Sequence, residues 1–217
     1  MMAYGLLLLA YVVGATPSSL WMGRVVYGVD LRREGSGNLG ATNTFRVLGW
    51  KAALPVFLAD ILKGYLPVAL FPGIAGINGA GWALAFGAAA ILGHVFSFWV
   101  GFRGGKGVAT STGVFLALAP LALLAVLVVW SALVATTRIV SLGSIAAAAT
   151  LPVAILLVPN EGGASLVLFA SGLALFVIWA HRENLARLAR GEEARFGSRA
   201  SQDSSPAGDK REAAHDG

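Results

Sequence analysis

The amino-acid sequence predicts an all-α polytopic membrane protein with about seven transmembrane helices. Of its 217 residues, 57% are hydrophobic and only 12% are charged, about half the charged fraction of an ordinary soluble domain. A hydrocarbon core of about 30 Å needs roughly 20 consecutive apolar residues, and this chain contains several uncharged segments of that length. A soluble globular protein, a disordered chain and a disulfide scaffold are therefore all excluded. The segments without any Asp, Glu, Lys or Arg are 1–23, 64–102, 107–137, 139–160 and 162–181.

The first apolar segment is expected to be a retained helix, because MMAYGLLLLAYVVG lacks a basic start and a small-residue cleavage site. We divide 107–137 at Pro120 into two helices, since the part before Pro120 is too short at about 1.5 Å per residue to cross alone. One long helix is the alternative, and it would place Arg138 outside. The expected helices lie at 3–23, 52–71, 81–100, 108–119, 120–137, 142–158 and 164–181.

These helices form a single membrane domain over 1–197. The segment 198–217 is rich in Ser, Gly and charge and is expected to be a disordered cytoplasmic tail.

The positions of Lys and Arg predict the topology. Apart from Lys63, which lies inside an apolar segment, the basic residues occur in 24–51, in 102–107, at Arg138 and from Arg182 onward, whereas 72–81 and 159–163 contain none. Under the positive-inside rule the basic loops are cytoplasmic and the N-terminus is outside. The C-terminus is then cytoplasmic.

Composition excludes several kinds of chemistry. With no cysteine, the chain has no thiolate nucleophile, cysteine-ligated metal or disulfide. Three scattered histidines do not favour a zinc site, so no metal is expected. The net charge of +5 could indicate nucleic acid, but the cations lie in loops beside apolar segments, and no nucleic-acid partner is expected.

The loop GSGNLGATNTFR (35–46) contains a G-x-G-x-x-G pattern. That pattern indicates a dinucleotide site only between a strand and a helix, and here it follows a membrane helix, so we reject that reading. What is left is a glycine-rich loop whose backbone N–H groups can surround an anion. A turn-rich connector is the alternative. If this loop binds an anion, its candidate binding residues are Ser36, Gly37, Asn38, Gly40, Thr42, Asn43 and Arg46.

The loop GHVFSFWVGFRGGKGVAT (93–110) places Lys106 among glycines, just before an expected helix N-terminus. Glycines allow close approach of the backbone, and helix N-termini favour anions, so we favour a phosphate site over a topological anchor. The pattern is not a Walker A loop, because Val100 and Gly107 stand where Gly and Ser/Thr are needed. The other candidates here are His94, Arg103, Gly104 and Gly105.

Two further polar segments and one charged pair complete the candidates. TTRIVSLGS (136–144) contains Ser141, and HRENLARLARGEE (181–193) contains His181 and Asn184, which are three residues apart and share a helix face. Interfacial snorkelling is the alternative for His181. Asp60 and Lys63 lie one turn apart within an apolar segment and are expected to pair, facing inward, because charges in a membrane are costly. We favour a structural role for that pair over a place in the site.

These motifs, in this order, resemble the PlsY family of bacterial membrane acyltransferases. The resemblance spans about residues 3–197 and is carried by SGNLGATNTFR, ADILKG, GHVFSFWVGFRGGKGVAT, RIVSLGS and HRENLARLARGEE. It implies a seven-helix enzyme, without a cofactor, that transfers a fatty acyl group from acyl phosphate to the 1-hydroxyl of glycerol 3-phosphate. The products would be lysophosphatidic acid and phosphate, in the first acylation of phospholipid synthesis.

The resemblance also implies roles for individual residues. Ser36 and the backbone at Gly37 and Asn38 would hold the acyl-phosphate phosphate. The acyl chain would lie in a groove open to membrane lipid. The residues implied to bind and orient glycerol 3-phosphate are Arg46, Lys106, Ser141, His181 and Asn184.

The chemistry of the residues agrees with two phosphate-bearing substrates, because two glycine-rich basic loops are present. Acyl phosphate is already activated, and no H-x-x-x-x-D pair occurs. We therefore expect direct attack by the glycerol hydroxyl, with its proton passing to a substrate phosphate or to His181. A transporter of phosphate or an organophosphate is the rival reading, although no inverted repeat is visible. A membrane scaffold that only holds anionic lipid is a third interpretation.

Overall fold

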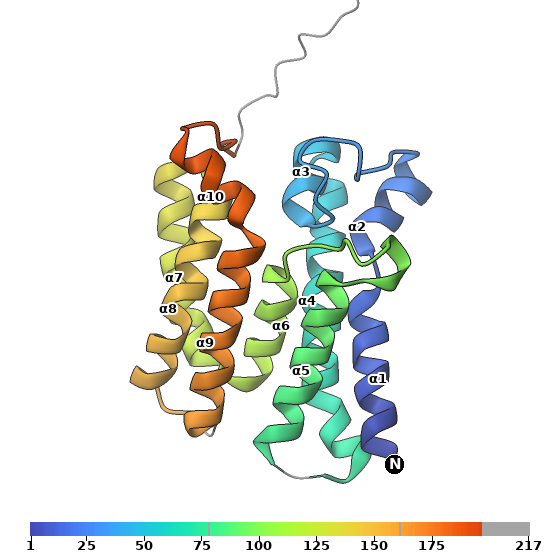
Figure 1. Cartoon of the computed structure of the whole chain (residues 1–217), viewed down its shortest axis with the longest axis vertical. Coiled ribbons are helices and arrows are strands. Elements are labelled where there is room, and N and C mark those ends of the chain that lie inside the picture. The colour runs from blue at the N-terminus through green and yellow to red at the C-terminus, as the bar shows by residue number, and fades with distance from the viewer. Residues whose placement is uncertain (78, 161, 197–217) are drawn as a thin grey trace, which may run out of the picture.

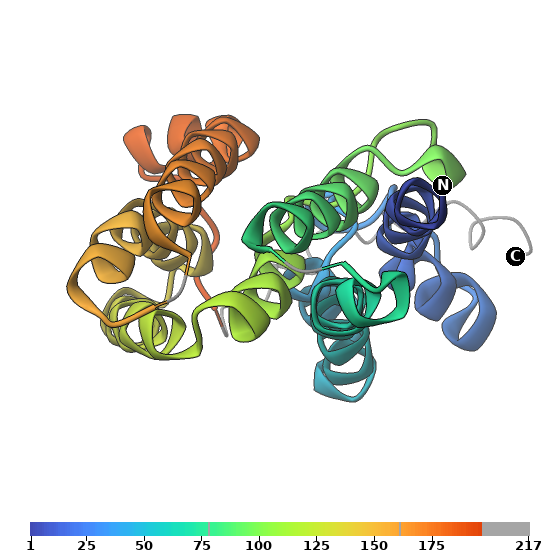
Figure 2. The same ribbon diagram turned by 90° about the horizontal axis from the view of Figure 1, so that it is seen from below.

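The structure is a computed structural model that describes residues 1–77, 79–160 and 162–196. Figure 1 shows two groups of helices standing side by side. The first group contains α1 (Met2–Ala15), α4 (Trp50–Ala75) and α5 (Ala80–Val95). The second group contains α7 (Pro120–Thr137), α8 (Val140–Leu157) and α9 (Gly163–Ala180). The short helix α6 (Val108–Leu118) lies between them and, seen from below in Figure 2, connects one group to the other.

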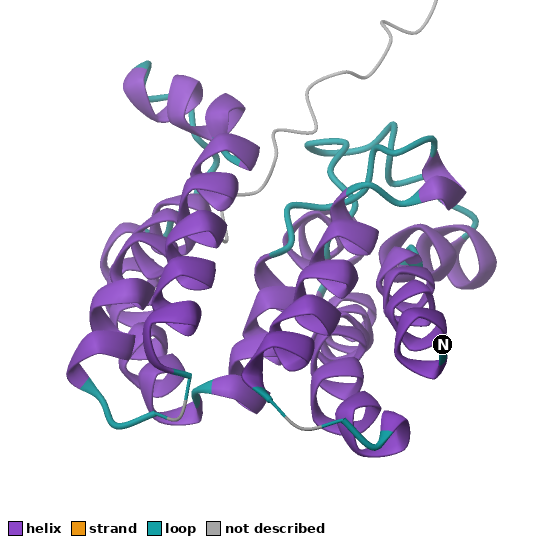
Figure 3. Cartoon of the chain, turned by 60° about the horizontal axis from the view of Figure 1, so that its bottom comes forward, coloured by secondary structure: helices purple, strands orange, loops and turns teal. Residues whose placement is uncertain are grey.

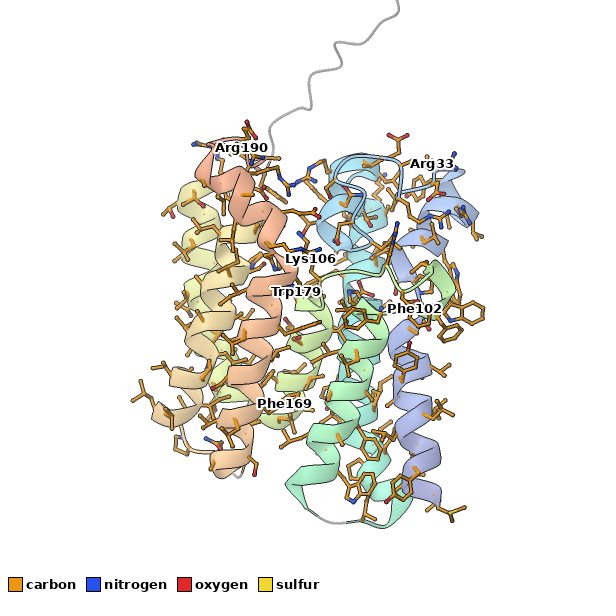
Figure 4. All side chains as sticks on the ribbon, in the orientation of Figure 1. Arg33, Phe102, Lys106, Phe169, Trp179 and Arg190 are labelled. Atoms are coloured by element: carbon orange, nitrogen blue, oxygen red, sulfur yellow. The ribbon has the colours of Figure 1, made fainter. Side chains whose placement is uncertain are left out.

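The described residues contain helices, turns and loops but no strand, as Figure 3 shows. At the end of the molecule opposite the N-terminus lie the helices α3 (Ala41–Leu48) and α10 (Arg182–Ala189). The labelled side chains of Arg33 and Arg190 also lie at this end in Figure 4. The basic loops of the two groups therefore gather at one end, which we call the basic end. The expected tail, 198–217, lies outside the described residues.

The predicted membrane helices are present in the structure. Among the described residues, five helical segments are long and apolar enough to span a bilayer, and a bent pair provides a sixth if it is taken as one span. The predicted division at Pro120 is confirmed, because α6 ends at Leu118 and Pro120 begins α7. Proline is favoured at the first position of a helix, where its missing N–H costs no hydrogen bond. The number of complete crossings stays a prediction, since the 11 residues of α6 rise only about 16 Å.

The predicted helix 3–23 is wrong as one continuous element. Helix α1 ends at Ala15, and α2 (Ser18–Trp21) with the π-helical turn η1 (Met22–Val26) continues at a bend of 42°. Pro17 lies in the break, where its ring and missing N–H prevent a regular helix. The bend frees the carbonyl oxygen of Thr16, which accepts a hydrogen bond from another helix, as described below.

The ends of other helices also differ from the predicted ones. The expected helix 81–100 ends at Val95 and is followed by a 3-10 turn, η2 (Phe98–Val100). The helix expected at 52–71 extends over the whole of α4. The segment 24–51, which was expected to be a loop, contains the helix α3. Helix α10 follows α9 after a break at His181.

Helices α4 and α6 approach closely through small residues. A Cβ at Gly64 of α4 would overlap the carbonyl of Thr110, and a Cβ at Gly113 of α6 would overlap the carbonyl of Ile61. Small residues permit such close packing between membrane helices. The start of α6 is thereby fixed against the middle of α4. On its other side, α6 contributes Val114 and Phe115 to a buried apolar core shared with α7, α8 and α9.

Candidate active site

A cavity of about 630 Å³ lies between the two groups of helices near the basic end. It is lined by the loop before α3, by α3 itself, by the middle of α4 and by the start of α6. Its opposite wall comes from α7, α8, α10 and residues 192–196. In Figure 4 the labelled Lys106 lies between the two groups, below the level of Arg33 and Arg190. Segments that are far apart in the sequence therefore meet at one cavity.

Most of the residues selected from the sequence line this cavity, from both groups of helices. Those present are Ser36, Asn38, Gly40, Thr42, Asn43, Arg46, His94, Lys106, Ser141, His181 and Asn184. The candidates Gly37, Arg103, Gly104 and Gly105 are not among the lining residues. Arg103 is exposed beside the exposed Phe102, so its side chain is outside the cavity that it was expected to serve.

The first glycine-rich loop is held in shape by Asn43, which is buried on α3. Its Oδ1 accepts hydrogen bonds from the backbone N–H of Ser36 at 2.8 Å and from the Ser36 hydroxyl at 3.1 Å. Its Nδ2 donates to the carbonyls of Leu31 and Glu34. Because both ends of the amide are engaged within the protein, the geometry gives Asn43 a loop-holding contact, whereas the sequence reading placed it among substrate-binding residues.

Arg46 projects from α3 on the first group of helices and lines the same cavity. Within the described ranges, no carboxylate forms an ion pair with it, in contrast to Arg24 and Arg32, which both pair with Asp30 at 2.8 Å. A cation without a protein counter-ion is suited to an anionic ligand.

The second loop is tied to the end of α5 by its backbone. The N–H of Gly104 donates to the Val95 carbonyl at 2.8 Å, and the N–H of Gly105 donates to the His94 carbonyl at 3.2 Å. A Cβ at Gly105 would overlap both the His94 ring and the Leu39 carbonyl. Gly104 and Gly105 thus shape the loop rather than line the cavity, and they bring Lys106 to the start of α6.

Lys106 is half-buried and donates a hydrogen bond through Nζ to Oδ1 of Asn184 on α10. Burial lowers the pKa of Lys106 to about 8, and the positive charge of Arg187 acts in the same direction. The carboxylate of Glu193 opposes this effect. Lys106 is therefore mainly protonated at pH 7, and an incoming phosphate would supply the counter-charge that it lacks.

Glu193 is a residue of this site that the sequence reading missed. Its carboxylate accepts hydrogen bonds from the Ser141 hydroxyl at 2.8 Å, from Asn184 Nδ2 at 2.5 Å and from Arg187 Nε at 2.7 Å. Burial would raise the pKa of Glu193, but these hydrogen bonds outweigh it and hold the pKa below its usual value. The available signal was a pair of carboxylates ending an otherwise cationic motif.

His181 is buried at the break between α9 and α10. Its Nδ1 lies 2.8 Å from the carbonyl of Val177, and because a carbonyl only accepts, the proton of the neutral ring is on Nδ1. Nε2 is then left as an acceptor. Burial lowers the pKa of His181 to about 4, so the ring is neutral at pH 7.

A second, smaller cavity of about 60 Å³ adjoins the first, since both are lined by Val108, Thr112 and Ser144. Its other lining residues come from α6, α7, α8 and α9 and are mainly apolar, among them Phe115 and Leu151. The arrangement therefore joins a polar, cationic cavity to an apolar one inside the second group of helices. Such a site fits a ligand with a phosphate at one end and the start of a hydrocarbon chain at the other.

Comparison with known proteins gives consistent results. The sequence model of the family described as glycerol-3-phosphate acyltransferase matches residues 4–191. A protein named glycerol-3-phosphate acyltransferase from Synechococcus elongatus is 48% identical over 200 residues, covering 89% of this chain and 94% of its own. One of the same name from Geobacter sulfurreducens is 46% identical over 190 residues, covering 86% of this chain and 94% of its own.

Two crystal structures of PlsY, an integral membrane glycerol 3-phosphate acyltransferase, have a similar fold. The glycerol 3-phosphate form is 37% identical with a TM-score of 0.81 and covers 91% of this chain and 96% of its own. The lysophosphatidic acid form is 36% identical with the same TM-score and coverage.

Proposed function

Because this chain belongs to the glycerol-3-phosphate acyltransferase family, we propose that its central cavity is where an acyl group passes from acyl phosphate to glycerol 3-phosphate. The acyltransferase reading, and not the transporter, agrees with the relatives and with the PlsY structures. The observation that carries the proposal is the contact of Lys106 with Asn184, which unites two separate motifs in one polar cavity next to an apolar one.

The acceptor substrate is held by cations and donors from both groups of helices. Arg46 and Lys106 bind the phosphate of glycerol 3-phosphate by charge-assisted hydrogen bonds. Ser141 and Asn184, oriented by Glu193, bind the polar groups of the glycerol backbone. These side chains come from α3, the loop before α6, α8 and α10, so the substrate contacts both groups of helices.

The acyl phosphate lies with its phosphate at the first glycine-rich loop. Ser36 and the backbone at Asn38 hold that phosphate, and Asn43 keeps the loop in shape. Gly37 itself is not a lining residue, so we assign it a loop-shaping role only. The start of the acyl chain enters the small apolar cavity between α6 and α9, and the rest of the chain lies in a groove open to membrane lipid.

The reaction is direct attack of the 1-hydroxyl of glycerol 3-phosphate on the acyl carbonyl carbon. A C–O bond forms to glycerol, the C–O bond to phosphate breaks, and inorganic phosphate leaves. His181 accepts a hydrogen bond from the hydroxyl through Nε2 and orients it. With a pKa of about 4, the imidazole is a weak base, so the proton passes to the departing phosphate. Preorganised N–H groups and cations stabilise the charge that develops on that phosphate.

The basic end of the molecule faces the cytoplasm in this proposal, and the membrane is the bacterial inner membrane. The support is the gathering of Arg33, Arg190 and the basic loops at one end, with the N-terminus at the other (Figures 1 and 4), which agrees with the positive-inside rule. Soluble glycerol 3-phosphate would then reach the cavity from the cytoplasm.

The test is acylation of glycerol 3-phosphate by the purified full chain in lipid. Acyl phosphate, an acyl-coenzyme A and an acyl carrier protein thioester are offered separately, and lysophosphatidic acid and free phosphate are both measured. We expect turnover with acyl phosphate alone and one phosphate released per acyl group transferred. Efficient turnover with a thioester would contradict the proposed donor, and no acylation with any donor would contradict the proposed reaction.

A further inference from the structure

A charged cluster lies beneath the cavity, inside a membrane-spanning helix. Asp60 and Lys63 of α4 are both at most 6% exposed, and Lys63 Nζ lies 2.7 Å from Asp60 Oδ1. The pairing predicted from the sequence is confirmed. Buried ions are costly to keep in a membrane protein and are retained mainly where they serve a function. A purely structural role leaves unexplained why Asp60 lines the cavity.

The pair is connected to the break after α1. Lys63 Nζ donates a hydrogen bond to the Thr16 carbonyl at 2.9 Å, and the Ser18 hydroxyl donates to Asp60 Oδ1 at 2.9 Å. Thr16 and Ser18 lie on either side of Pro17, where the chain bends. The polar groups exposed by the bend are thus satisfied by α4, and the pair fixes the first two helices to it.

On its other side, the pair faces the loop that carries Lys106. His94 Nδ1 lies 3.8 Å from Asp60 Oδ1, which is beyond hydrogen-bond range but close enough for packing contact. The opposite edge of the same ring packs against Gly105, where a Cβ would overlap Nε2 and Cε1. The His94 carbonyl also accepts the Gly105 N–H. His94 is therefore enclosed between Asp60 and the Lys106 loop.

From these contacts we infer that Asp60, held by Lys63, is a positioning residue for glycerol 3-phosphate. It fixes His94, and His94 fixes the loop from Gly104 to Lys106. The inference rests on the proposed binding of substrate phosphate by Lys106. It predicts that loss of the pair weakens glycerol 3-phosphate binding more than acyl-phosphate binding. The first glycine-rich loop is held separately by Asn43, although its Leu39 carbonyl lies beside Gly105.

The experiment separates this role from a merely structural one. Asp60→Asn leaves Lys63 buried without a counter-charge, which destabilises the fold by itself. The double variant Asp60→Asn with Lys63→Met removes both charges, and replacing a buried pair completely is often neutral for stability. For each purified variant in lipid, the thermal unfolding midpoint and the KM for each substrate are measured.

We expect the single variant to unfold several degrees earlier than the wild type, and the double variant to recover most of that loss. In the double variant the KM for glycerol 3-phosphate should stay raised about fivefold or more, with the KM for acyl phosphate within twofold of the wild type. Asp30→Asn is the matched control, because it removes a carboxylate that pairs with arginines outside the cavity, and it should change neither KM.

A double variant with wild-type stability and both wild-type KM values would overturn the inference. If the double variant cannot be purified in a folded state, Ser18→Ala provides the test instead, because it removes one hydrogen bond to Asp60 without changing the charge. We expect it to raise the KM for glycerol 3-phosphate about two- to threefold, and an unchanged KM would overturn the inference. Lys106→Ala is measured alongside, and an unchanged KM in that variant would instead show that the proposed role of Lys106 is wrong.

Discussion

Lys106 and Asn184 are 78 positions apart in the sequence, yet a hydrogen bond from the lysine Nζ to the amide Oδ1 joins them across the boundary between the two helix groups. Asn184 is held in turn by Glu193, which also accepts hydrogen bonds from Ser141 and Arg187. A cation from the first half of the chain is thereby connected, through Asn184, to Glu193, Ser141 and Arg187 of the second half.

Replacement of Lys106 by alanine should reduce kcat/KM for glycerol 3-phosphate about ten- to a hundredfold. Loss of one hydrogen bond to a charged group costs about 1.5–3 kcal/mol. Arg190→Ala is the matched control, because Arg190 is exposed and pairs only with Glu192 among the described residues. Steady-state rates at equal protein concentration provide the measurement. Equal losses in the two variants would contradict a specific phosphate contact at Lys106.

The activity should depend on the protonation of Lys106. With a pKa of about 8, Lys106 is charged below that pH and neutral above it. Because kcat/KM reports ionisations of the free enzyme, it should fall about tenfold per pH unit above pH 8. Lys106→Arg should have lower activity but no such fall, since arginine keeps its charge. A decline of the same steepness in both proteins would assign the ionisation to another group.

Gly105→Ala should inactivate the enzyme with little change in its membrane helices. The added Cβ would overlap the His94 ring and the Leu39 carbonyl, so the loop that carries Lys106 must move. Gly172→Ala in α9 is the control, because a Cβ there meets no atom within 4 Å. For both variants, turnover is measured together with helix content, which is determined by circular dichroism. Full activity in Gly105→Ala would show that the loop tolerates this displacement.

Glu193→Gln should raise the KM for glycerol 3-phosphate severalfold. The substitution keeps the size of the side chain but removes the charge that accepts hydrogen bonds from Ser141, Asn184 and Arg187, so those groups lose their fixed orientation. Glu34→Gln is the control, because Glu34 is exposed and is not among the residues that line the cavity. If the two variants have the same KM, Glu193 does not orient the substrate-binding side chains.

The proposed topology can be tested with single cysteines, because the chain has none of its own. A cysteine in place of Arg190 should be labelled by a membrane-impermeant thiol reagent only after the cells are opened. A cysteine in place of the exposed Pro159, in a connection without Lys or Arg, should be labelled in intact cells. The reverse pattern would show that the basic end faces outward.

Much of this protein could be predicted from its sequence because the membrane limits the choices. In a hydrocarbon core the backbone must satisfy its own hydrogen bonds, so long apolar segments become helices. The division at Pro120 followed from the same reasoning, since proline begins a helix more readily than it continues one. The basic and glycine-rich motifs also identified most of the residues that line the cavity.

The sequence alone determined the helical membrane class, the family resemblance and the types of side chain at the site. Only the tertiary structure decided which of these side chains meet. The break at Pro17, the carboxylate of Glu193 between Ser141 and Asn184, and the enclosure of His94 between Asp60 and Gly105 all depend on contacts between distant segments. Local patterns record whether a residue is apolar or charged, but a partner is fixed only when helices pack, because packing sets the distances on which hydrogen bonds and ion pairs depend.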